Sequence, residues 1–301
     1  MKIVITGATG FVGQNLVAYL QQKNYEISSI SLREKEWKKS ILLEGQAIIH
    51  LVGKAHDTTN SSSSDEYFRV NRDLTIEVFN EFLKSKVRDF FYFSSVKAVA
   101  DSVIGILDEN TVPVPKTPYG KSKLETEEYL LNQKIPDGKR LFIIRPCMIH
   151  GPGNKGNLNL LYNIVEKGIP WPLASFRNNR SFLCIDNLSF LIEAMISDVN
   201  LPSGIYNFSD DDFVSTNELV TVIAKILGNK GRLLSIPPIF IQFIAKIGDV
   251  IPFPLNSERL KKLTESYLVS NDKIKKGLNI DKLPLSTKDG LEKTIRSFKG
   301  R

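Results

Sequence analysis

The first thirteen residues constrain the fold more than any other stretch of the chain. The short apolar run Lys2–Ile5 has the character of a buried parallel strand, and residues 14–23 carry helical periodicity. Between them, Gly7, Gly10 and Gly13 recur at a spacing of three. Glycines let the backbone approach a pyrophosphate, and the N-terminus of the following helix offers it unpaired N–H groups. A strand, a glycine turn and a helix in this order therefore predict a dinucleotide site.

Strands and helices continue to alternate up to about residue 150, which predicts a Rossmann-type, doubly wound parallel sheet of the α/β class. We expect further strands over Glu26–Ser31, Ala47–Val52, Phe90–Ser95 and Arg140–Pro146, and helices over Glu66–Leu83 and from Pro118 onward. Beyond residue 151 the predicted strands and helices no longer alternate regularly. We therefore assign 1–150 to the cofactor domain, with its sheet completed by part of 151–215, and 151–301 mainly to a smaller C-terminal substrate-binding lobe.

The tip of the second strand bears on the choice of cofactor. Many NAD-binding folds have an acidic residue there, which bonds the ribose 2′-hydroxyl. Here Ser31 stands at that position and Arg33 follows, an arrangement that suits the 2′-phosphate of NADP. The acidic residue Glu34 is close to this position in the sequence, so NAD remains an alternative. The cofactor expected is therefore NADP or NAD.

Charge and cysteine content narrow the class of protein. The formal net charge of +7 could attract nucleic acid or anionic lipid, but it equally suits an enzyme whose ligands carry diphosphates, and we expect no nucleic-acid partner. Cys147 and Cys184 lie in apolar runs, which indicates buried thiols and a cytoplasmic location. The three histidines show no metal-ligand spacing, and no signal peptide is expected because the first strand begins at residue 2.

The most apolar later stretch is Ile236–Leu255, which prolines and charged residues interrupt too often for an integral membrane span. The sequence favours an apolar helix within it, over Ile236–Val250, that packs on the protein. Contact with a membrane surface is the alternative.

Tyr119 and Lys123 carry the candidate chemistry. They are four residues apart on a predicted helix, so they share a face. A tyrosine with its usual pKa of about 10 is a poor base at neutral pH, but a neighbouring ammonium favours the phenolate. We therefore expect Lys123 to lower the pKa of Tyr119, so that the phenol can exchange a proton with a sugar or alcohol oxygen.

Taken together, these motifs resemble the nucleotide-sugar epimerase/dehydratase family of extended short-chain dehydrogenases/reductases. The segments that carry the resemblance are Thr6–Gly13, His50–Gly53, Asn71, Ser94-Ser95, Tyr119–Lys123, Arg145-Pro146 and Gly151–Gly153. The Ser94–Lys97, Gly151–Asn157 and Arg177–Ser181 segments are similar to a subgroup of UDP-glucose 4-epimerase-like proteins, which includes reductases of UDP-4-keto-6-deoxy-hexosamines used in surface polysaccharides.

The resemblance implies a role for each matching residue. Tyr119 would be the proton donor or acceptor, Lys123 would bond the nicotinamide ribose, and Ser95 would bond the substrate oxygen. Lys97, Asn157 and Arg180 would bind the substrate, the last two at its diphosphate. The cofactor would be bound by Gly7, Thr9, Gly10, Phe11, Val12, Gly13, Ser31, Arg33, Leu51, Val52, Gly53, Asn71, Ser94, Lys123 and Pro146.

Two departures from the family pattern indicate which of the family's activities this chain has. Many members have the catalytic serine or threonine one position after Ser95, where this chain has Val96. The dehydratases then carry an Asp-Glu pair, where this chain has Lys97 and Ala98, so a dehydratase is not expected. The implied function is oxidoreduction at C4 of a UDP-sugar, by a 4-epimerase or a 4-keto reductase, with a homodimer as a possible assembly. The alternatives are a non-catalytic NADP sensor and a reductase of hydrophobic ketones.

Overall fold

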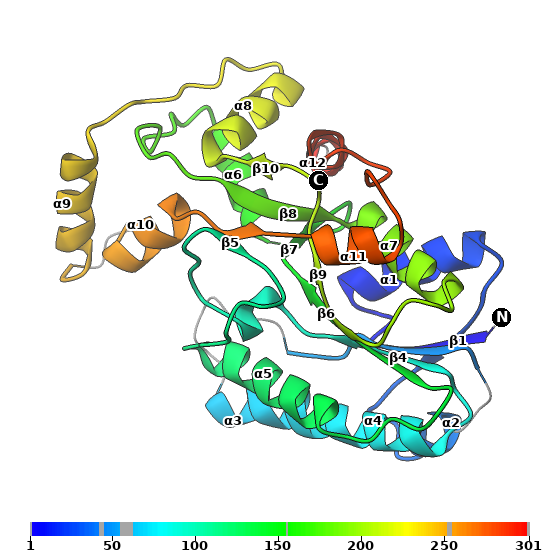
Figure 1. Cartoon of the computed structure of the whole chain (residues 1–301). Helices are drawn as coiled ribbons and strands as arrows, with labels where there is room; N and C mark the ends of the chain where they lie inside the picture. The colour runs from blue at the N-terminus through cyan, green and yellow to red at the C-terminus, as the bar shows by residue number, and fades with distance from the viewer. Residues whose placement is uncertain (1, 42–44, 55–62, 155, 252–254, 300–301) are drawn as a thin grey trace.

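A six-stranded parallel sheet forms the centre of the computed structural model (Figure 1). It confirms the predicted α/β fold. The structure describes residues 2–41, 45–54, 63–154, 156–251 and 255–299, with Ser40 and Asn157 described by their backbone alone. In spatial order the strands are β2 (Glu26–Ile30), β1 (Lys2–Thr6), β3 (Ala47–His50), β4 (Asp89–Phe93), β6 (Arg140–Pro146) and β9 (Gly204–Phe208).

Two layers of helices cover the sheet because alternate strand residues face opposite sides. In β1, Ile3 and Ile5 pack with α1 (Phe11–Gln22) and α7 (Ile185–Ser197), whereas Val4 packs with the helices on the other face. The helices of that second layer are α2 (Trp37–Ile41), α3 (Ser64–Tyr67), the π-helical segment η1 (Phe68–Asp73), α4 (Leu74–Lys84) and α5 (Pro118–Leu131).

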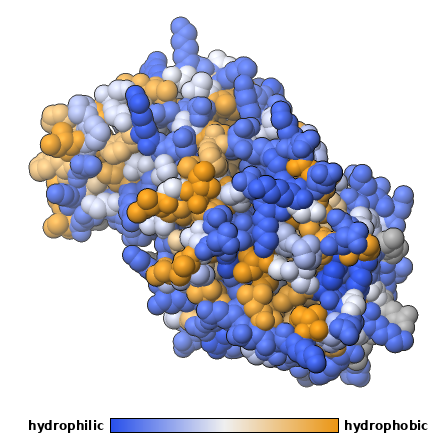
Figure 2. All heavy atoms as spheres, in the orientation of Figure 1, coloured by the Kyte–Doolittle hydropathy of each residue, from blue (hydrophilic) through white to orange (hydrophobic). Residues whose placement is uncertain are grey.

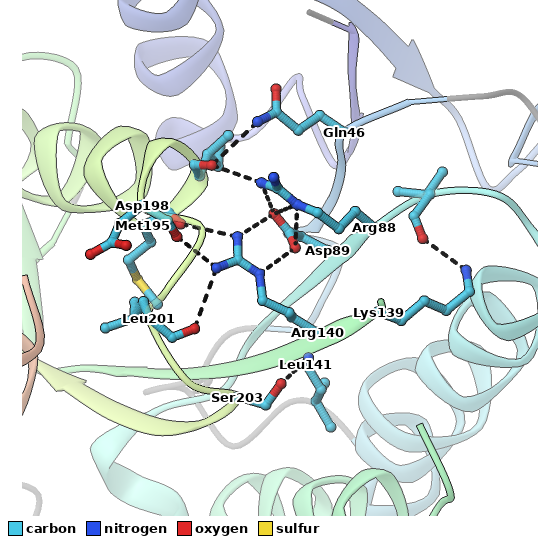
Figure 3. A network of polar contacts seen from close by, with 12 residues as sticks. Gln46, Arg88, Asp89, Lys139, Arg140, Leu141, Met195, Asp198, Leu201 and Ser203 are labelled. Carbon is cyan, nitrogen blue, oxygen red and sulfur yellow. Dashed lines mark hydrogen bonds and ion pairs between the residues drawn. The ribbon is translucent and has the colours of Figure 1, made fainter. Parts of the chain in front are cut away.

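A charged network fastens the amino end of the sheet (Figure 3). Asp89, fully buried at the start of β4, receives two hydrogen bonds from Arg140, of 2.7 and 2.8 Å, and further bonds from Arg88. The two guanidinium groups also donate to carbonyl oxygens at the end of α7, those of Ile196 and Asp198. Because every charge here has a partner and the site residues follow the opposite strand ends, we regard this network as structural.

The second lobe is built on a three-stranded mixed sheet. Its strands, in the order β10 (Phe213–Val214), β8 (Arg180–Cys184) and β7 (Met148–His150), pack with helices around a separate apolar core. The helices beyond residue 150, apart from α7, are α6 (Asn157–Glu166), α8 (Thr216–Leu227), α9 (Pro238–Gly248), α10 (Ser257–Thr264), α11 (Asp272–Gly277) and α12 (Thr287–Arg296).

The C-terminal third returns to the first domain after building much of this lobe. Strand β11 (Leu268–Val269) pairs in parallel with β5 (Ile106–Leu107), and α11 packs beside β9. Val269, Ile274 and Leu283 all belong to the apolar core that β1 shares with α1 and α7. The two lobes are therefore interleaved along the chain.

Helix α9 corrects one expectation from the sequence. The predicted apolar helix is present, but only Ile241 and Ala245 of it are buried. With α10 it forms a hairpin at the far edge of the second lobe (Figure 1). Among the described residues, no helix combines the length and the apolar character that a membrane crossing requires.

Candidate active site

The predicted cofactor residues gather at the carboxyl ends of four strands. Gly7 follows β1, Leu51–Gly53 follow β3, Ser94 and Ser95 follow β4, and Pro146 ends β6. Because these strands are parallel neighbours, the residues lie along one edge of the sheet. This edge is where ligands bind in open α/β sheets.

The glycine turn leaves a cradle above α1. Gly7 has φ of +76°, and a Cβ on it would lie 2.9 Å from the backbone nitrogen of Val52. A Cβ on Gly13 would lie 2.3 Å from the carbonyl oxygen of Gly7, so these two glycines are required by the chain's own packing. A Cβ on Gly10 would meet nothing closer than 3.4 Å, and no side chain caps the helix that starts at Phe11. The open side at Gly10 and the uncapped N–H groups fit a pyrophosphate.

The residues expected to select the cofactor lie just beyond β2. Ser31 and Arg33 are exposed there. Within the described part of the chain, no carboxylate pairs with Arg33. A guanidinium without a partner at this tip fits a 2′-phosphate.

Helix α5 brings Tyr119 to Ser95 through a close backbone contact. The helix begins at Pro118, and the Thr117 hydroxyl caps it by accepting from Gly120 N at 3.2 Å. A Cβ on Gly120 would lie 2.4 Å from the carbonyl oxygen of Lys97, so only glycine allows the helix so near the 3₁₀ segment η2 (Val96–Ala98). The Ser95 hydroxyl accepts from Lys97 N at 3.2 Å and lies close enough to the Tyr119 phenol to lower its pKa.

Lys123 lies one turn further along α5 and is almost fully buried. Its Nζ donates to the carbonyl oxygen of Phe93 at 2.8 Å and lies 4.9 Å from the centre of the Tyr92 ring. Burial lowers the pKa of Lys123 to about 7, and the Glu127 carboxylate opposes that shift. Near neutral pH this amine can therefore gain or lose its charge.

The expected effect of Lys123 on the tyrosine is corrected by the structure. Burial raises the pKa of Tyr119 above its usual value, and the contact that lowers it is the hydrogen bond with Ser95. The ring of Tyr67 packs edge-on against Tyr119, with the ring centres 6.1 Å apart, and adds to the burial. In the cofactor-free chain the phenol is therefore a proton donor rather than a phenolate.

A buried ion pair lies beneath these residues. Glu127, one turn after Lys123, accepts hydrogen bonds of 3.0 and 3.1 Å from Arg145 Nε, and both side chains are almost completely buried. The Ser94 hydroxyl, predicted to touch the cofactor, also donates to Glu127. The sequence analysis missed Glu127, although its spacing of four from Lys123 and eight from Tyr119 puts it on the same helix face.

Asn71 has its amide committed within the protein. Its oxygen accepts from Lys54 N at 2.7 Å, and its nitrogen donates to the Ser122 hydroxyl at 3.1 Å. A Cβ on Gly53 would lie 3.2 Å from both Asn71 Oδ1 and Lys123 Nζ. Asn71 therefore joins the loop after β3 to helix α5.

Two cations lie on the second-lobe side of the site, and Lys97 Nζ donates to the carbonyl oxygen of Asp101 at 2.7 Å. Lys97 Nζ lies 4.2 Å from the centre of the Tyr267 ring, and burial together with the nearby Arg180 charge lowers its pKa. Burial also lowers the pKa of Arg180, whose guanidinium donates to the carbonyl oxygens of Lys262 and Glu265 at the end of α10. The side chain of Asn157, the third predicted substrate residue, lies outside the described residues; its backbone starts α6.

Tyr267 is a second residue that the sequence analysis missed. Its hydroxyl donates to the carbonyl oxygens of Val96 and Ala100, at 3.2 and 2.7 Å, which fastens η2 to the C-terminal segment. No motif surrounds Tyr267 in the sequence. Only the tertiary structure shows that Tyr267 contacts Lys97.

The other titratable candidates are structural. His50 is buried between the hydroxyls of Thr6 and Thr75, and burial lowers its pKa to about 3. Cys147 and Cys184 are free and buried, as predicted. The described residues contain no group of three or more His, Cys, Asp or Glu that could hold a metal ion.

Comparisons with known proteins identify the family. The sequence model of the NAD dependent epimerase/dehydratase family matches residues 3–208. UDP-glucose 4-epimerase of Vibrio cholerae is 28% identical over 99% of this chain and 95% of its own length. N-acetyl-alpha-D-glucosaminyl-diphospho-ditrans,octacis-undecaprenol 4-epimerase of Escherichia coli O157:H7 is 27% identical over 91% of this chain and 85% of its own.

Solved structures match over the whole chain. MoeE5 in complex with UDP-glucuronic acid and NAD superposes with a TM-score of 0.78 at 17% identity, covering 99% of both chains. RMD from Pseudomonas aeruginosa complexed with NADPH gives a TM-score of 0.75 at 18% identity, over 100% of this chain and 99% of that one. The matched residues cover the strand ends, the glycine turn and the Tyr119–Lys123 helix described above. The chain belongs to the NAD dependent epimerase/dehydratase family.

Proposed function

We propose that this protein oxidises and reduces C4 of the sugar in a UDP-hexose, with NAD or NADP as the hydride carrier. The observation that carries the proposal is the half-buried Tyr119 phenol, whose pKa the neighbouring Ser95 hydroxyl lowers, one helical turn from the buried amine of Lys123. This is an arrangement for moving a proton to and from an alcohol oxygen. The bound cofactor supplies the hydride transfer itself.

Three residues of the chain carry out the proton transfer that accompanies the hydride transfer. Tyr119 gives its proton to the sugar oxygen when a ketone is reduced, and takes one from the hydroxyl in the opposite direction. Ser95 Oγ, next to the phenol, holds the reacting oxygen beside it. When the Lys123 amine is protonated, it stabilises the phenolate that remains, because an ammonium nearby favours the ionised phenol.

Lys97 and Arg180 support a nucleotide diphosphate as the other end of the substrate. Two partly buried cations, of which Arg180 lowers the proton affinity of Lys97, both gain from an anion bound beside them. A hydrophobic ketone would not use them, and a sensor without catalysis would not need the Tyr119–Ser95 pair. Both alternatives therefore leave part of the site unexplained.

The 4-epimerase is the form that the relatives support, since two of them that are aligned with most of this chain are named 4-epimerases. An epimerase oxidises C4, presents the ketone by its other face and reduces it, so it consumes no cofactor. Arg33, which pairs with no carboxylate among the described residues, favours the second candidate, an NADPH-dependent 4-keto reductase, because that enzyme must recruit fresh NADPH.

The test is incubation of the purified protein with UDP-sugars in one arm and UDP-4-keto-6-deoxy sugars in the other, each with and without NADPH. Products are read by proton NMR. Interconversion of C4 epimers without added reductant identifies the epimerase, and NADPH-dependent loss of the ketone identifies the reductase. The absence of both reactions, with UDP failing to bind, would refute the proposal.

A further inference from the structure

Helix α9 exposes a continuous apolar surface. Ile239, Phe240, Phe243, Ile244 and Ile247 recur at spacings of three and four, so they lie on one side of the helix, which we call the outer face of α9. Ile239, Phe240 and Phe243 are 70%, 62% and 63% exposed. Val250 and Ile251, directly after the helix, are also exposed and extend this surface.

The opposite side of the helix is already used. Ile241 and Ala245 are buried in the core of the second lobe, where Leu260 of α10 also lies. Gly248 permits the tight hairpin, because a Cβ there would lie 2.0 Å from the carbonyl oxygen of Leu255. A helix that is apolar on both sides is normally buried on both, but no other part of the described chain covers the outer face.

We propose that the outer face of α9 docks onto an anionic lipid surface. Residues 229–262 contain six basic side chains, of which Lys246 stands on α9 itself, and only two acidic ones, Asp249 and Glu258. Asp249 keeps its charge while it accepts two hydrogen bonds from Ser257, and Glu258 pairs with Lys262 at 2.6 Å, so six basic and two acidic side chains leave this segment a formal net charge of +4. An apolar helix face flanked by lysine and arginine is the composition of helices that lie in a membrane interface.

The place of the hairpin in the fold agrees with a lipid surface. Helix α9 stands at the outer end of the molecule, and apolar residues gather over that end (Figures 1 and 2). A projecting apolar face enters the boundary between headgroups and acyl chains without needing a shaped groove. A second copy of the chain or a protein partner would have to offer such a groove. Vesicle sedimentation and analytical ultracentrifugation distinguish these partners from a lipid surface.

Docking by this face would bear on the site already described. Arg180 donates to the carbonyl oxygens of Lys262 and Glu265, so the last turn of α10 is bonded to the proposed diphosphate-binding residue. A membrane that holds the hairpin therefore also holds the substrate end of the site near the lipid headgroups. The docking itself does not depend on the proposed reaction.

The test is sedimentation of the whole protein with phospholipid vesicles. We expect binding to vesicles of phosphatidylglycerol and phosphatidylcholine in equal parts, little binding to phosphatidylcholine alone, and release at high salt, because salt screens surface charges. The double variant Phe240→Ser/Phe243→Ser should lower the partition into the mixed vesicles by about ten-fold or more, since two exposed aromatic rings lose their apolar burial.

Leu160→Ser is the matched control, because Leu160 is 63% exposed on α6, outside the hairpin. It should sediment as the wild type does. Equal binding by the double variant, no binding by the wild type, or equal binding to neutral vesicles would each overturn the proposal. Analytical ultracentrifugation distinguishes the second copy: a wild-type dimer that the double variant breaks, without vesicle binding, would assign the face to self-association. The salt release is measured on the wild type and so stands even if the double variant folds poorly.

Discussion

The buried Glu127–Arg145 pair allows a sharp prediction about the stability of the site. Glu127→Gln keeps the shape of the side chain but leaves the Arg145 guanidinium buried without an opposite charge. Removing one partner of a buried pair costs about 3–5 kcal/mol. At about 2 °C per kcal/mol for a chain of this size, the midpoint of thermal unfolding should fall by about 6–10 °C.

Two variants control this experiment. Glu125→Gln, on the same helix, removes a half-exposed partner of Arg72 and should change the unfolding free energy by about 0–1 kcal/mol. Glu127→Leu/Arg145→Met replaces both charges with apolar groups and should recover much of the loss, because an apolar pair can substitute for a buried ion pair. Thermal unfolding followed by circular dichroism measures all three. A Glu127→Gln midpoint close to that of Glu125→Gln would refute the reasoning.

The same substitution should change the pH dependence of turnover. Burial lowers the pKa of Lys123 to about 7 and Glu127 opposes that shift, so Glu127→Gln should lower it further. If the reaction needs the ammonium form, activity is present below this pKa and is lost as the pH rises through it. The alkaline limb of kcat/KM should therefore move to lower pH in the variant, whereas Glu125→Gln should leave it in place. An unshifted limb would show that Lys123 does not act through its charge.

Three further substitutions test the proposed roles. Tyr119→Phe should lower turnover by about 10²-fold or more while the cofactor still binds, with Tyr129→Phe on the same helix as control; near wild-type turnover would remove Tyr119 from the reaction. Arg33→Ala should weaken NADPH binding more than NADH binding in fluorescence titrations, because only NADPH has a 2′-phosphate, and equal weakening would argue against the NADP assignment. Arg180→Lys should raise the calorimetric Kd for UDP by about ten-fold, whereas Arg177→Lys, at an exposed position shortly before β8, should not; indistinguishable values would exclude Arg180 from the diphosphate site.

Elements with local signals could be predicted from the sequence. Helix α8 runs over Thr216–Leu227. Ser215 and Glu218 form a capping box at its start, and Gly228 ends it in the left-handed conformation, so both boundaries are encoded within a few residues. The strand ends that bring the site residues together can also be predicted, because short apolar runs mark the strands and parallel strands have their carboxyl ends at one edge of the sheet.

Features that depend on distant residues could not be predicted. The pKa of Tyr119 was expected to follow the charge of Lys123, four residues away, but burial by residues such as Tyr67 decides it. Tyr267 meets Lys97 across a sequence separation that carries no local pattern. For α9 the periodicity shows an apolar helix but not how much of it the fold covers, and only the tertiary structure shows that its outer face is open.

The interleaving of the lobes has a consequence for synthesis on the ribosome. The core under β1 is completed by Val269, Ile274 and Leu283, so it cannot close until almost the whole chain has emerged. At about 5–20 residues per second, the strands made first wait for roughly 15–60 s with apolar surface uncovered. A nascent chain halted after β9 should therefore bind a holding chaperone, and it should become protease-resistant only once the residues up to Leu283 have been added.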